Sequence, residues 1–383
     1  MFVAGDPSGD EHASAVIKRL PGLLPGTTTF GIGGPKMAAA GFEQLMPFEP
    51  FNRMGLLEVV RQLPFFLKAK SKLVNVLARR KPSVLVCVDY PGFNIPLMKA
   101  AHAKGIPVVW YIVPQVWAWK KNRAETLGRF ASFIAVVFPF EAPYFSPFPA
   151  PVSFVGHPLV EALDEGIDFP PVQPKASRLD KNGPIRCAIV PGSRVQEIRL
   201  MLGPMMQACE ILMRKYPRFS VTVSKCIGLP QELFAMHCDT LLALYPGRVS
   251  VSEDPLVNVL AASDCAVVTS GTATLQTALM RVPLVIAYRT SGLTYSLLKR
   301  MVTLPYIGLP NIVAGEKIVP ELIQDQVTPH ALADAVSQYV ESPVLYAQTV
   351  GRLGALREKL GGKKPSVEVA SAIRSLVMTD DRA

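Results

Sequence analysis

Three side chains stand where a sequence of this kind could take a proton from a substrate. Asp89 directly follows the apolar run Val84–Val88, so we expect it at the carboxyl end of a central strand. His12 lies near the end of the loop after the first apolar run, and His157 stands in the segment FVGHP. A carboxylate or an imidazole can deprotonate a hydroxyl group as that group attacks. The choice among the three stays open, because a lone histidine is more often a structural hydrogen-bonding residue.

Two turns in the second half of the chain have the composition of anion sites. After an apolar run that ends at Val190, the chain continues with Gly192, Ser193 and Arg194, and an arginine there can neutralise a departing diphosphate. A second apolar run ends at Thr269 and leads to the segment that contains Ser270, Gly271, Thr272, Thr274 and Gln276. Hydroxyls and free N–H groups at a helix N-terminus attract anions, although the same residues also fit a simple helix cap. Two such turns favour a nucleotide diphosphate over a single phosphate.

The first turn, AGDPSGDEH at 4–12, has two possible interpretations. It either brings backbone N–H groups near a ligand or is an ordinary connection between a strand and a helix. Glycines permit a tight turn there, and Ser8 with Glu11 predicts a capping box, with Ser8 and Gly9 facing an acceptor. The segment GIGGP at 31–35 resembles a dinucleotide fingerprint only superficially, because Pro35 interrupts the spacing. The sequence therefore does not favour a nicotinamide cofactor.

Two segments carry candidate contacts to a lipid. Residues 54–72 place Met54, Phe65 and Phe66 beside lysines, as expected either for a helix that rests among lipid headgroups or holds an acyl chain, or for a core-facing helix with a basic outer side. Trp117, in the rigid segment PQVWAW, either lines a sugar or acyl pocket or fills a core.

The elements that must position these residues follow an α/β pattern. Short apolar runs alternate with helical segments, which predicts parallel sheets with crossover helices. The expected strands are 1–4, 28–32, 84–88, 108–112, 133–137 and 152–155 in the first half, and 187–190, 219–223, 248–251, 265–269 and 284–288 in the second. Residues 161–184 are rich in Pro, Asp, Lys and Gly and are expected to form a linker. We therefore predict two doubly wound, Rossmann-like domains that face a central cleft, at 1–165 and 166–350, with a helical segment at 351–383 that packs back on the first domain.

Charge and composition narrow the partners. The 383 residues include 40 Lys and Arg against 30 Asp and Glu, a net charge of +10. A basic surface of this kind suits anionic lipid or is simply a solvated face, and no module typical of nucleic-acid binding accompanies it. The longest uncharged run, 142–160, contains five prolines, so any membrane association is expected to be peripheral.

Cysteine usage and the first residues indicate the compartment. Six cysteines are scattered without a Cys-x-x-Cys pair, as expected for buried thiols in a reducing compartment and not for a zinc site. The start of the chain lacks the pattern of a secretory signal. We therefore expect a cytoplasmic location.

Together, these segments resemble the lipid-A-disaccharide synthase family, glycosyltransferase family 19. The resemblance runs over nearly the whole chain through AGDPSGD at 4–10, GIGGPKM at 31–37, MGLLEV at 54–59, DYPGFN at 89–94, PQVWAW at 114–119, FPFE at 138–141, FVGHP at 154–158, PGSR at 191–194, SGTATLQ at 270–276, AYR at 287–289 and LPN at 309–311.

The resemblance implies a GT-B fold and action at the inner-membrane surface without a metal or other cofactor. It implies transfer from UDP-2,3-diacylglucosamine to 2,3-diacylglucosamine 1-phosphate (lipid X), with inversion, to give lipid A disaccharide 1-phosphate and UDP. By the same resemblance, Asp89 is the acceptor base, Arg194 contacts the UDP diphosphate, Asn311 belongs to the active site, and the C-terminal half forms a homodimer. Asp89 and Arg194 are then expected to face each other across the cleft.

Two departures from the family pattern keep alternatives open. Gly92 stands where many relatives carry a second Asp, and Gln276 stands where a Glu is common. The alternatives are another GT-B transferase of a lipid-linked sugar, of the peptidoglycan-precursor type, and a non-catalytic protein that binds a nucleotide sugar or lipid.

Overall fold

The chain folds into two compact α/β units. The computed structural model describes residues 1–51, 56–118, 122–166, 183–290 and 305–380. The first unit comprises Met1–Glu161 and Leu360–Ala383, and the second comprises Ala162–Lys359. The chain therefore leaves the first unit once and returns to it at the end.

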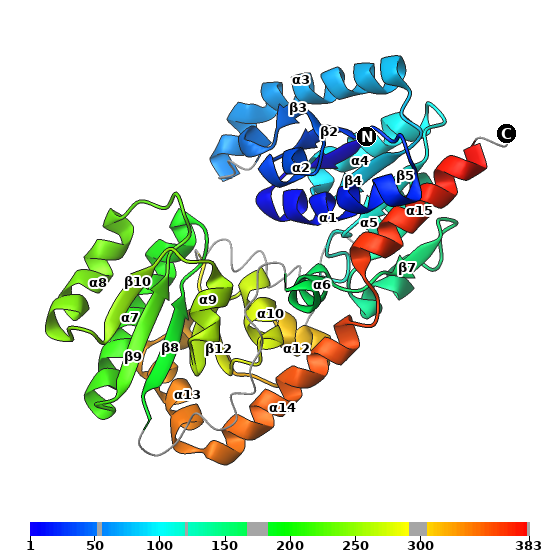
Figure 1. Ribbon diagram of the computed structural model, residues 1–383. Helices are drawn as coiled ribbons and strands as arrows, with labels where there is room; N and C mark the ends of the chain where they lie inside the picture. The colour runs from blue at the N-terminus through cyan, green and yellow to red at the C-terminus, as the bar shows by residue number, and fades with distance from the viewer. Residues whose placement is uncertain (52–55, 119–121, 167–182, 291–304, 381–383) are drawn as a thin grey trace. The chain divides into compact units, whose positions relative to one another are not determined.

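The first unit is built on a seven-stranded parallel sheet with the order β3-β2-β1-β4-β5-β6-β7 (Figure 1). Its strands are β1 (Phe2–Ala4), β2 (Phe30–Gly33), β3 (Glu43–Pro47), β4 (Leu85–Val88), β5 (Val108–Tyr111), β6 (Phe133–Val136) and β7 (Val152–Phe154). The central strands are apolar throughout and buried, as parallel strands covered on both faces must be.

Helices cover both faces of this sheet. They are α1 (Pro7–Leu23), α2 (Pro35–Ala39), α3 (Leu56–Arg80), α4 (Pro91–His102), α5 (Asn122–Phe130) and the C-terminal α15 (Pro365–Asp380), with 3-10 turns at Glu49–Phe51 and Pro139–Tyr144. Helix α6 (Pro158–Glu165) contains the point at which the chain passes from the first unit to the second. Several begin with proline, whose missing N–H costs nothing in a first turn. Helix α15 packs along α1, so the chain ends on the unit in which it began (Figure 1).

The second unit repeats the plan with a six-stranded parallel sheet of order β10-β9-β8-β11-β12-β13. Its strands are β8 (Ile185–Val190), β9 (Phe219–Ser224), β10 (Val249–Ser252), β11 (Cys265–Thr269), β12 (Leu284–Tyr288) and β13 (Glu321–Ile323). Its helices are α7 (Val195–Lys215), α8 (Glu232–Leu244), α9 (Leu256–Ala261), α10 (Thr272–Leu279), α12 (Leu309–Ala314), α13 (Pro329–Glu341) and α14 (Pro343–Leu360), with a 3-10 turn at Gln324–Gln326.

The predicted fold class is confirmed, and the apolar runs predicted as strands all form strands. Two strands were not predicted, β3 and β13, and each lies at the edge of its sheet. Their residues are partly exposed and carry polar side chains, so they lack the continuous apolar run of a buried parallel strand. That the two sheets face each other across a cleft stays a prediction.

Three local expectations are wrong. The expected linker begins too early, because residues up to Glu165 belong to α6, and within this helix Glu161 is buried against Ser366. Helix α1 is capped by Asp6 and not by Ser8, because Pro7 starts the helix and the Asp6 carboxylate accepts the Gly9 N–H at 2.6 Å. Of the cysteines, Cys226 is exposed, whereas the other five are buried.

Candidate functional site

Each sheet has one point at which the chain order reverses, and such points are where doubly wound sheets bind ligands. In the first unit the order reverses between β1 and β4, which lead to Asp6 and Asp89. In the second unit it reverses between β8 and β11, which lead to the turns at 191–194 and 270–274. The sequence motifs with the strongest chemistry therefore lie at the two switch points.

Asp89 is held in an unusual backbone conformation. Its φ is 44° and that of Tyr90 is 52°, in the left-handed region that residues with a Cβ rarely adopt. The Asp89 N–H still donates to the Tyr111 carbonyl at 2.9 Å, which extends the β4–β5 ladder by one residue. The fully buried side chain of Asn94 donates to the Asp89 carbonyl at 2.8 Å. Strained backbone that is fixed from several sides is typical of functional sites.

The electrostatics of Asp89 suit a general base. Burial, followed by the nearby charge of Asp6, raises the pKa of Asp89 from its ordinary 3.8 to about 6. The backbone N–H of Tyr90 and the guanidinium of Arg123 oppose this shift by favouring the carboxylate. Asp89 is thus ionised near neutral pH and still basic enough to accept a proton.

The two histidines differ in what they can do. His157 Nδ1 accepts the Leu159 N–H at 3.2 Å, so the neutral ring carries its proton on Nε2. Burial, followed by the charge of His12, lowers the pKa of His157 to about 3, and this tautomer has no free lone pair for a substrate proton. His12 Nε2 lies 3.1 Å from the Ser8 hydroxyl, and burial is the main cause that lowers its pKa. His12 is therefore also neutral near pH 7.

The glycine segments around β1 and β2 are explained by packing. A Cβ on Gly5 would lie 2.6 Å from Cγ of Tyr90, so the first motif and DYPGFN pack directly on each other. The segment GIGGP is held by Asp10, whose carboxylate accepts the N–H groups of Gly34 at 2.8 Å and Met37 at 3.0 Å. Gly9 is buried and Ser8 is exposed. The hydrogen bonds from GIGGP and α2 to Asp10 therefore join α1 to α2, which gives this segment a structural role and not that of a nucleotide-binding turn.

The candidate lipid contacts occupy different environments. Phe65 and Phe66 are partly buried and form an aromatic cluster with Phe51, at ring-centroid distances of 5.0 and 5.7 Å. Trp117 is only 4% exposed and donates from Nε1 to Oε1 of Glu141 at 3.1 Å. Met54 lies outside the described residues. Contact between these residues and a lipid stays a prediction, and the described ones pack into the core.

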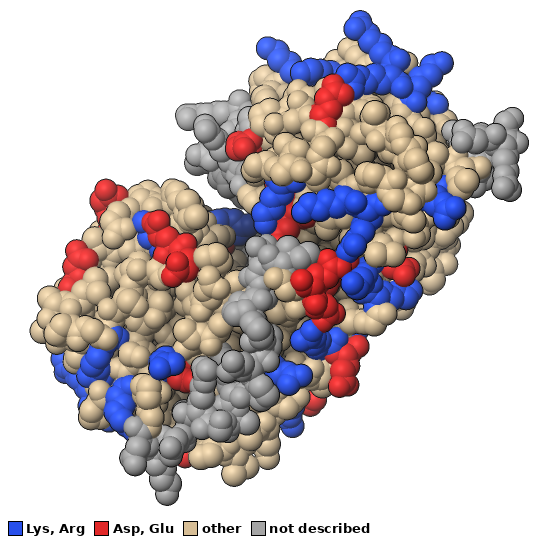
Figure 2. Space-filling model, in the orientation of Figure 1, with Lys and Arg blue, Asp and Glu red and all other residues tan. Residues whose placement is uncertain are grey.

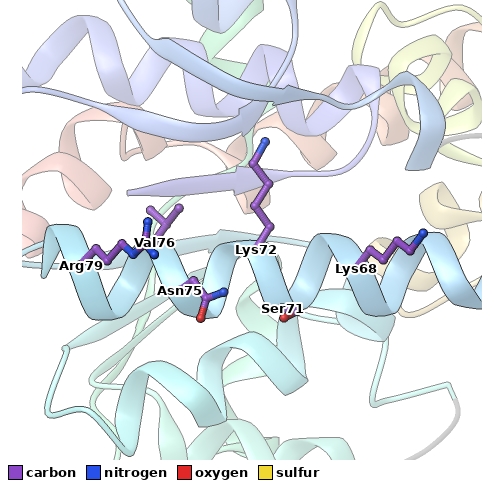
Figure 3. Close-up of a pocket in the computed structure, with 6 residues that line it drawn as sticks. All are labelled: Lys68, Ser71, Lys72, Asn75, Val76 and Arg79. Carbon is purple, nitrogen blue, oxygen red and sulfur yellow. The ribbon is translucent and has the colours of Figure 1, made fainter.

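The outer face of α3 is basic. Its inner face buries Ala69, Leu73 and Leu77, while Lys and Arg side chains gather over the helix in Figure 2. A groove of about 490 Å³ runs along this helix, and Figure 3 shows the residues that line it: Lys68, Ser71, Lys72, Asn75, Val76 and Arg79. Helix α3 thus has the arrangement of a core-facing helix with a basic outer side.

In the second unit, Arg194 is the N-cap of α7, and its side chain is 76% exposed. It forms an ion pair with Glu197, with 2.7 Å between Nη1 and Oε1. The other carboxylate oxygen of Glu197 accepts the N–H groups of Ser193 at 2.9 Å and Arg194 at 3.2 Å, beside Gly192. Glu197 thus already accepts the free N–H groups in the first turn of α7. The group in this turn that remains exposed to bind an anion is the guanidinium of Arg194.

The turn at 270–274 offers N–H groups instead. Gly271 caps α10 without a side-chain hydrogen bond, and a Cβ there would meet open space. Gly271 and Thr272 are exposed, whereas Thr274 is fully buried and its hydroxyl donates to the Gly271 carbonyl at 2.7 Å. Ser270 Oγ donates to the Ile307 carbonyl at 3.0 Å, and Gln276 lies partly buried within the helix. This N-terminus suits a phosphate group.

Asn311 is fully buried and uses its whole amide within the fold. Its Nδ2 donates to the Val319 carbonyl at 2.9 Å and to Glu321 at 2.8 Å, and its Oδ1 accepts the N–H groups of Ile318 and Val319. The Glu321 carboxylate also accepts the N–H groups of Ile307 and Gly308, both at 2.9 Å. Asn311 thus fixes the segment that contacts Ser270, and its direct contact with a ligand stays a prediction.

Four side chains of these sites were not predicted: Asp6, Arg123, Glu141 and Glu321. The first three shape the environment of Asp89, and their signal was present in the quoted or adjoining segments AGDPSGD, WKKNR and FPFE. Glu321 had no signal, because it lies on the unpredicted edge strand β13. Across the described residues, no group of three or more His, Cys, Asp or Glu side chains could hold a metal ion.

Two doubly wound parallel sheets, each with polar turns at its switch point, are the arrangement of the GT-B fold. Solved structures agree on the fold: MurG from Acinetobacter baumannii superposes with a TM-score of 0.61 at 15% identity, covering 98% of both chains. UDP-GlcNAc 2-epimerase from Neisseria meningitidis, bound to UDP-GlcNAc, has a TM-score of 0.61 at 14% identity, with 100% of this chain and 98% of that chain covered.

Sequence comparison gives the family. The model described as Lipid-A-disaccharide synthetase matches residues 1–354. Lipid-A-disaccharide synthase from Geobacter metallireducens is 37% identical over 377 residues, which cover 98% of this chain and 97% of that protein. The chain belongs to the lipid-A-disaccharide synthase family of glycosyltransferases.

Proposed function

We propose that this chain joins two acylated glucosamine units into the lipid A disaccharide and releases UDP. Family membership over nearly the full length supports the reaction class. The observation that carries the assignment is that both switch points hold fitting chemistry: a carboxyl group with a pKa of about 6 in the first unit, and anion-binding turns in the second. The donor is UDP-2,3-diacylglucosamine, and the acceptor is 2,3-diacylglucosamine 1-phosphate.

The reaction follows from these residues by inverting displacement. Asp89 takes the proton of the acceptor hydroxyl, whose oxygen attacks the anomeric carbon of the donor. The bond from that carbon to the diphosphate oxygen breaks, and UDP leaves with the bonding electrons. His12, which is neutral and lies beside the Ser8 hydroxyl at the same switch point, is the second candidate for the base that takes this proton.

The second unit stabilises the leaving group. Arg194 neutralises the charge that develops on the diphosphate, while the N-terminus of α10, which has no side-chain cap hydrogen bond, offers the N–H groups of Gly271 and Thr272. Gln276 replaces a charged ribose partner with a side chain that can still donate and accept hydrogen bonds. These groups stabilise the leaving charge without a metal ion.

The enzyme acts as a peripheral protein at the inner-membrane surface. None of the helices in the described part of the chain has the length and apolar character that crossing a bilayer requires. The basic outer face of α3 supports docking on anionic headgroups. Association as a homodimer through the second unit is supported by its exposed apolar side chains Ile227, Met236, Leu244 and Val344, and sedimentation of the purified protein tests it.

A donor-choice assay tests the function. Purified protein with EDTA, UDP-2,3-diacylglucosamine and the acylated sugar phosphate is expected to give a disaccharide phosphate and UDP in equal amounts. Unacylated UDP-N-acetylglucosamine is the control donor and should not be used. Turnover of the control donor alone would indicate a peptidoglycan-precursor type of transferase, and no UDP release from either donor would indicate a binding protein.

A further inference from the structure

One buried acid of the first unit takes no direct part in the reaction described above. Glu141 is 1% exposed and lies in the 3-10 turn after β6. Its Oε2 accepts the N–H groups of Val137 at 3.2 Å and Phe138 at 3.1 Å, and its Oε1 accepts the Trp117 Nε1–H at 3.1 Å. These three partners are all N–H donors, so the surroundings of the Glu141 carboxylate suit a group that only accepts hydrogen bonds.

These contacts tie together the ends of neighbouring strands. Asp89 follows β4, Trp117 lies in the loop after β5, and Val137 follows β6, and the three strands are adjacent in the parallel sheet. Ile112, the first residue after β5, has a φ of 64°, which is strained for a β-branched residue. The loop after β5 therefore leaves the sheet in a conformation that needs an anchor, and the bond from Trp117 to Glu141 supplies one.

The charge of Asp89 also affects the pKa of Glu141. Burial, opposed by the three N–H donors and reinforced last by the charge of Asp89, raises the pKa of Glu141 to about 7. Burial and the charge of Asp6 raise the pKa of Asp89 to about 6, while Tyr90 and Arg123 oppose this shift, so both acids titrate near neutral pH. Phe138, which donates its N–H to Glu141, also packs on the neutral ring of His157, with 5.0 Å between the ring centroids, and His157 lies near His12.

We propose that Glu141 is a positioning residue of the transferase, whose carboxylate anchors the loop after β5 through Trp117 and so fixes the wall beside Asp89. This inference rests on the proposed role of Asp89 as the base. An amide cannot replace the carboxylate, because its NH2 group would face an N–H donor in either orientation. Protonation of Glu141 likewise removes one acceptor.

Three variants test the anchor: Glu141→Gln, Trp117→Phe and the double variant. We expect Glu141→Gln to lower kcat by roughly tenfold or more, because small misplacements beside reacting atoms cost this much, with UDP affinity unchanged. In the double variant phenylalanine removes the opposing N–H, so its kcat should equal or exceed that of Glu141→Gln alone. If the two effects multiply instead, or if Glu141→Gln has wild-type kcat, the inference is wrong.

The pH profile separates positioning from a general loss of structure. In the wild type, the acid limb of the plot of log kcat against pH should approach a slope of two, since both acids must lose a proton. In Glu141→Gln, this limb should have a slope of one and lie near the pKa of Asp89. Glu161→Gln removes another buried carboxylate, which bonds Ser366, and should keep the wild-type slope. An unchanged slope in Glu141→Gln would contradict the proposal. Should Glu141→Gln fail to fold, Trp117→Phe must still lower kcat.

Asp89→Asn distinguishes the two levels of the account. If Asp89→Asn keeps full activity, the proposed function of Asp89 fails. If Asp89→Asn is inactive while Glu141→Gln and Trp117→Phe behave like the wild type, only the anchor is wrong.

Discussion

At the scale of single residues, the chemistry of this chain depends on how its neighbours set the properties of Asp89. A raised pKa in a buried acid means that the folded protein holds its ionised form at a cost. The pKa shift from 3.8 to about 6 corresponds to about 3 kcal/mol of lost stability, by the standard conversion per pKa unit. If Asp89 is the base as proposed, the site gains proton-transfer chemistry at the expense of stability.

Asp89→Asn should accordingly stabilise the protein while it inactivates it. The cost of ionised Asp89 is absent below its unfolded pKa, grows as pH rises from about 4 to 6, and is complete above. Urea unfolding should thus show Asp89→Asn more stable by up to about 3 kcal/mol at pH 7, with the difference vanishing near pH 4. A difference that is independent of pH would contradict this explanation.

Two neighbouring charges should shift the pH profile in opposite directions. Asp6 raises the pKa of Asp89, so Asp6→Asn, which can still cap α1, should move the acid limb of kcat/KM to lower pH. Arg123 lowers that pKa, so Arg123→Gln should move the limb to higher pH. Shifts in the same direction for both variants would show that the charges of these groups are not responsible.

Single-residue roles were only partly predictable from the sequence. Asp89, Arg194 and Gly271 could be placed because each follows an apolar strand of a parallel sheet. The hydrogen bonds of Trp117 and Asn311 could not, because their partners Glu141 and Glu321 lie on other elements. A motif states which residue recurs, whereas its hydrogen bonds depend on the strand order of the whole sheet.

At the scale of elements, Gly5 in the first turn is required for the packing between two segments. Gly5→Ala would place Cβ against the Tyr90 ring at 2.6–3.0 Å, and Tyr90 OH is itself bonded to the Phe51 carbonyl at 3.0 Å. We expect a loss of about 1–3 kcal/mol in the free energy of unfolding, as for other overpacked cores. Gly92→Ala is the matched control, because a Cβ there meets nothing within 4 Å. Equal stabilities of the two variants would contradict the packing explanation.

Whether a strand could be predicted from the sequence depends on its position in the sheet. Buried strands such as β11 and β12 were predicted to the residue, because both of their faces are apolar. The edge strands β3 and β13 were not predicted, because their residues are partly exposed and so do not form a continuous apolar run. Gly92 lies in the first turn of α4, where a Cβ would meet nothing within 4 Å, so a larger side chain would also fit there.

At the scale of the whole molecule, the net charge is +10, and we propose that the basic residues of α3 are the part of this charge that binds anionic lipid. Reversal of three charges on α3, as Lys68→Glu, Lys72→Glu and Arg79→Glu together, should weaken binding to vesicles that contain anionic lipid by at least roughly tenfold. Sedimentation with vesicles measures this, and added salt should weaken wild-type binding as well. The same reversal at Lys18, Lys104 and Arg352 changes the net charge equally and should have a smaller effect. Equal losses in both triple variants would show that α3 is not the docking surface.

In the proposed reaction, the first unit deprotonates the acceptor and the second unit binds UDP. The most direct test is the rate of UDP release by Asp89→Asn, with UDP affinity measured on the same sample. We predict a loss of roughly 100-fold or more in kcat, the usual contribution of a general base, with unchanged UDP affinity. UDP release by Asp89→Asn at a rate close to that of the wild type would contradict the account.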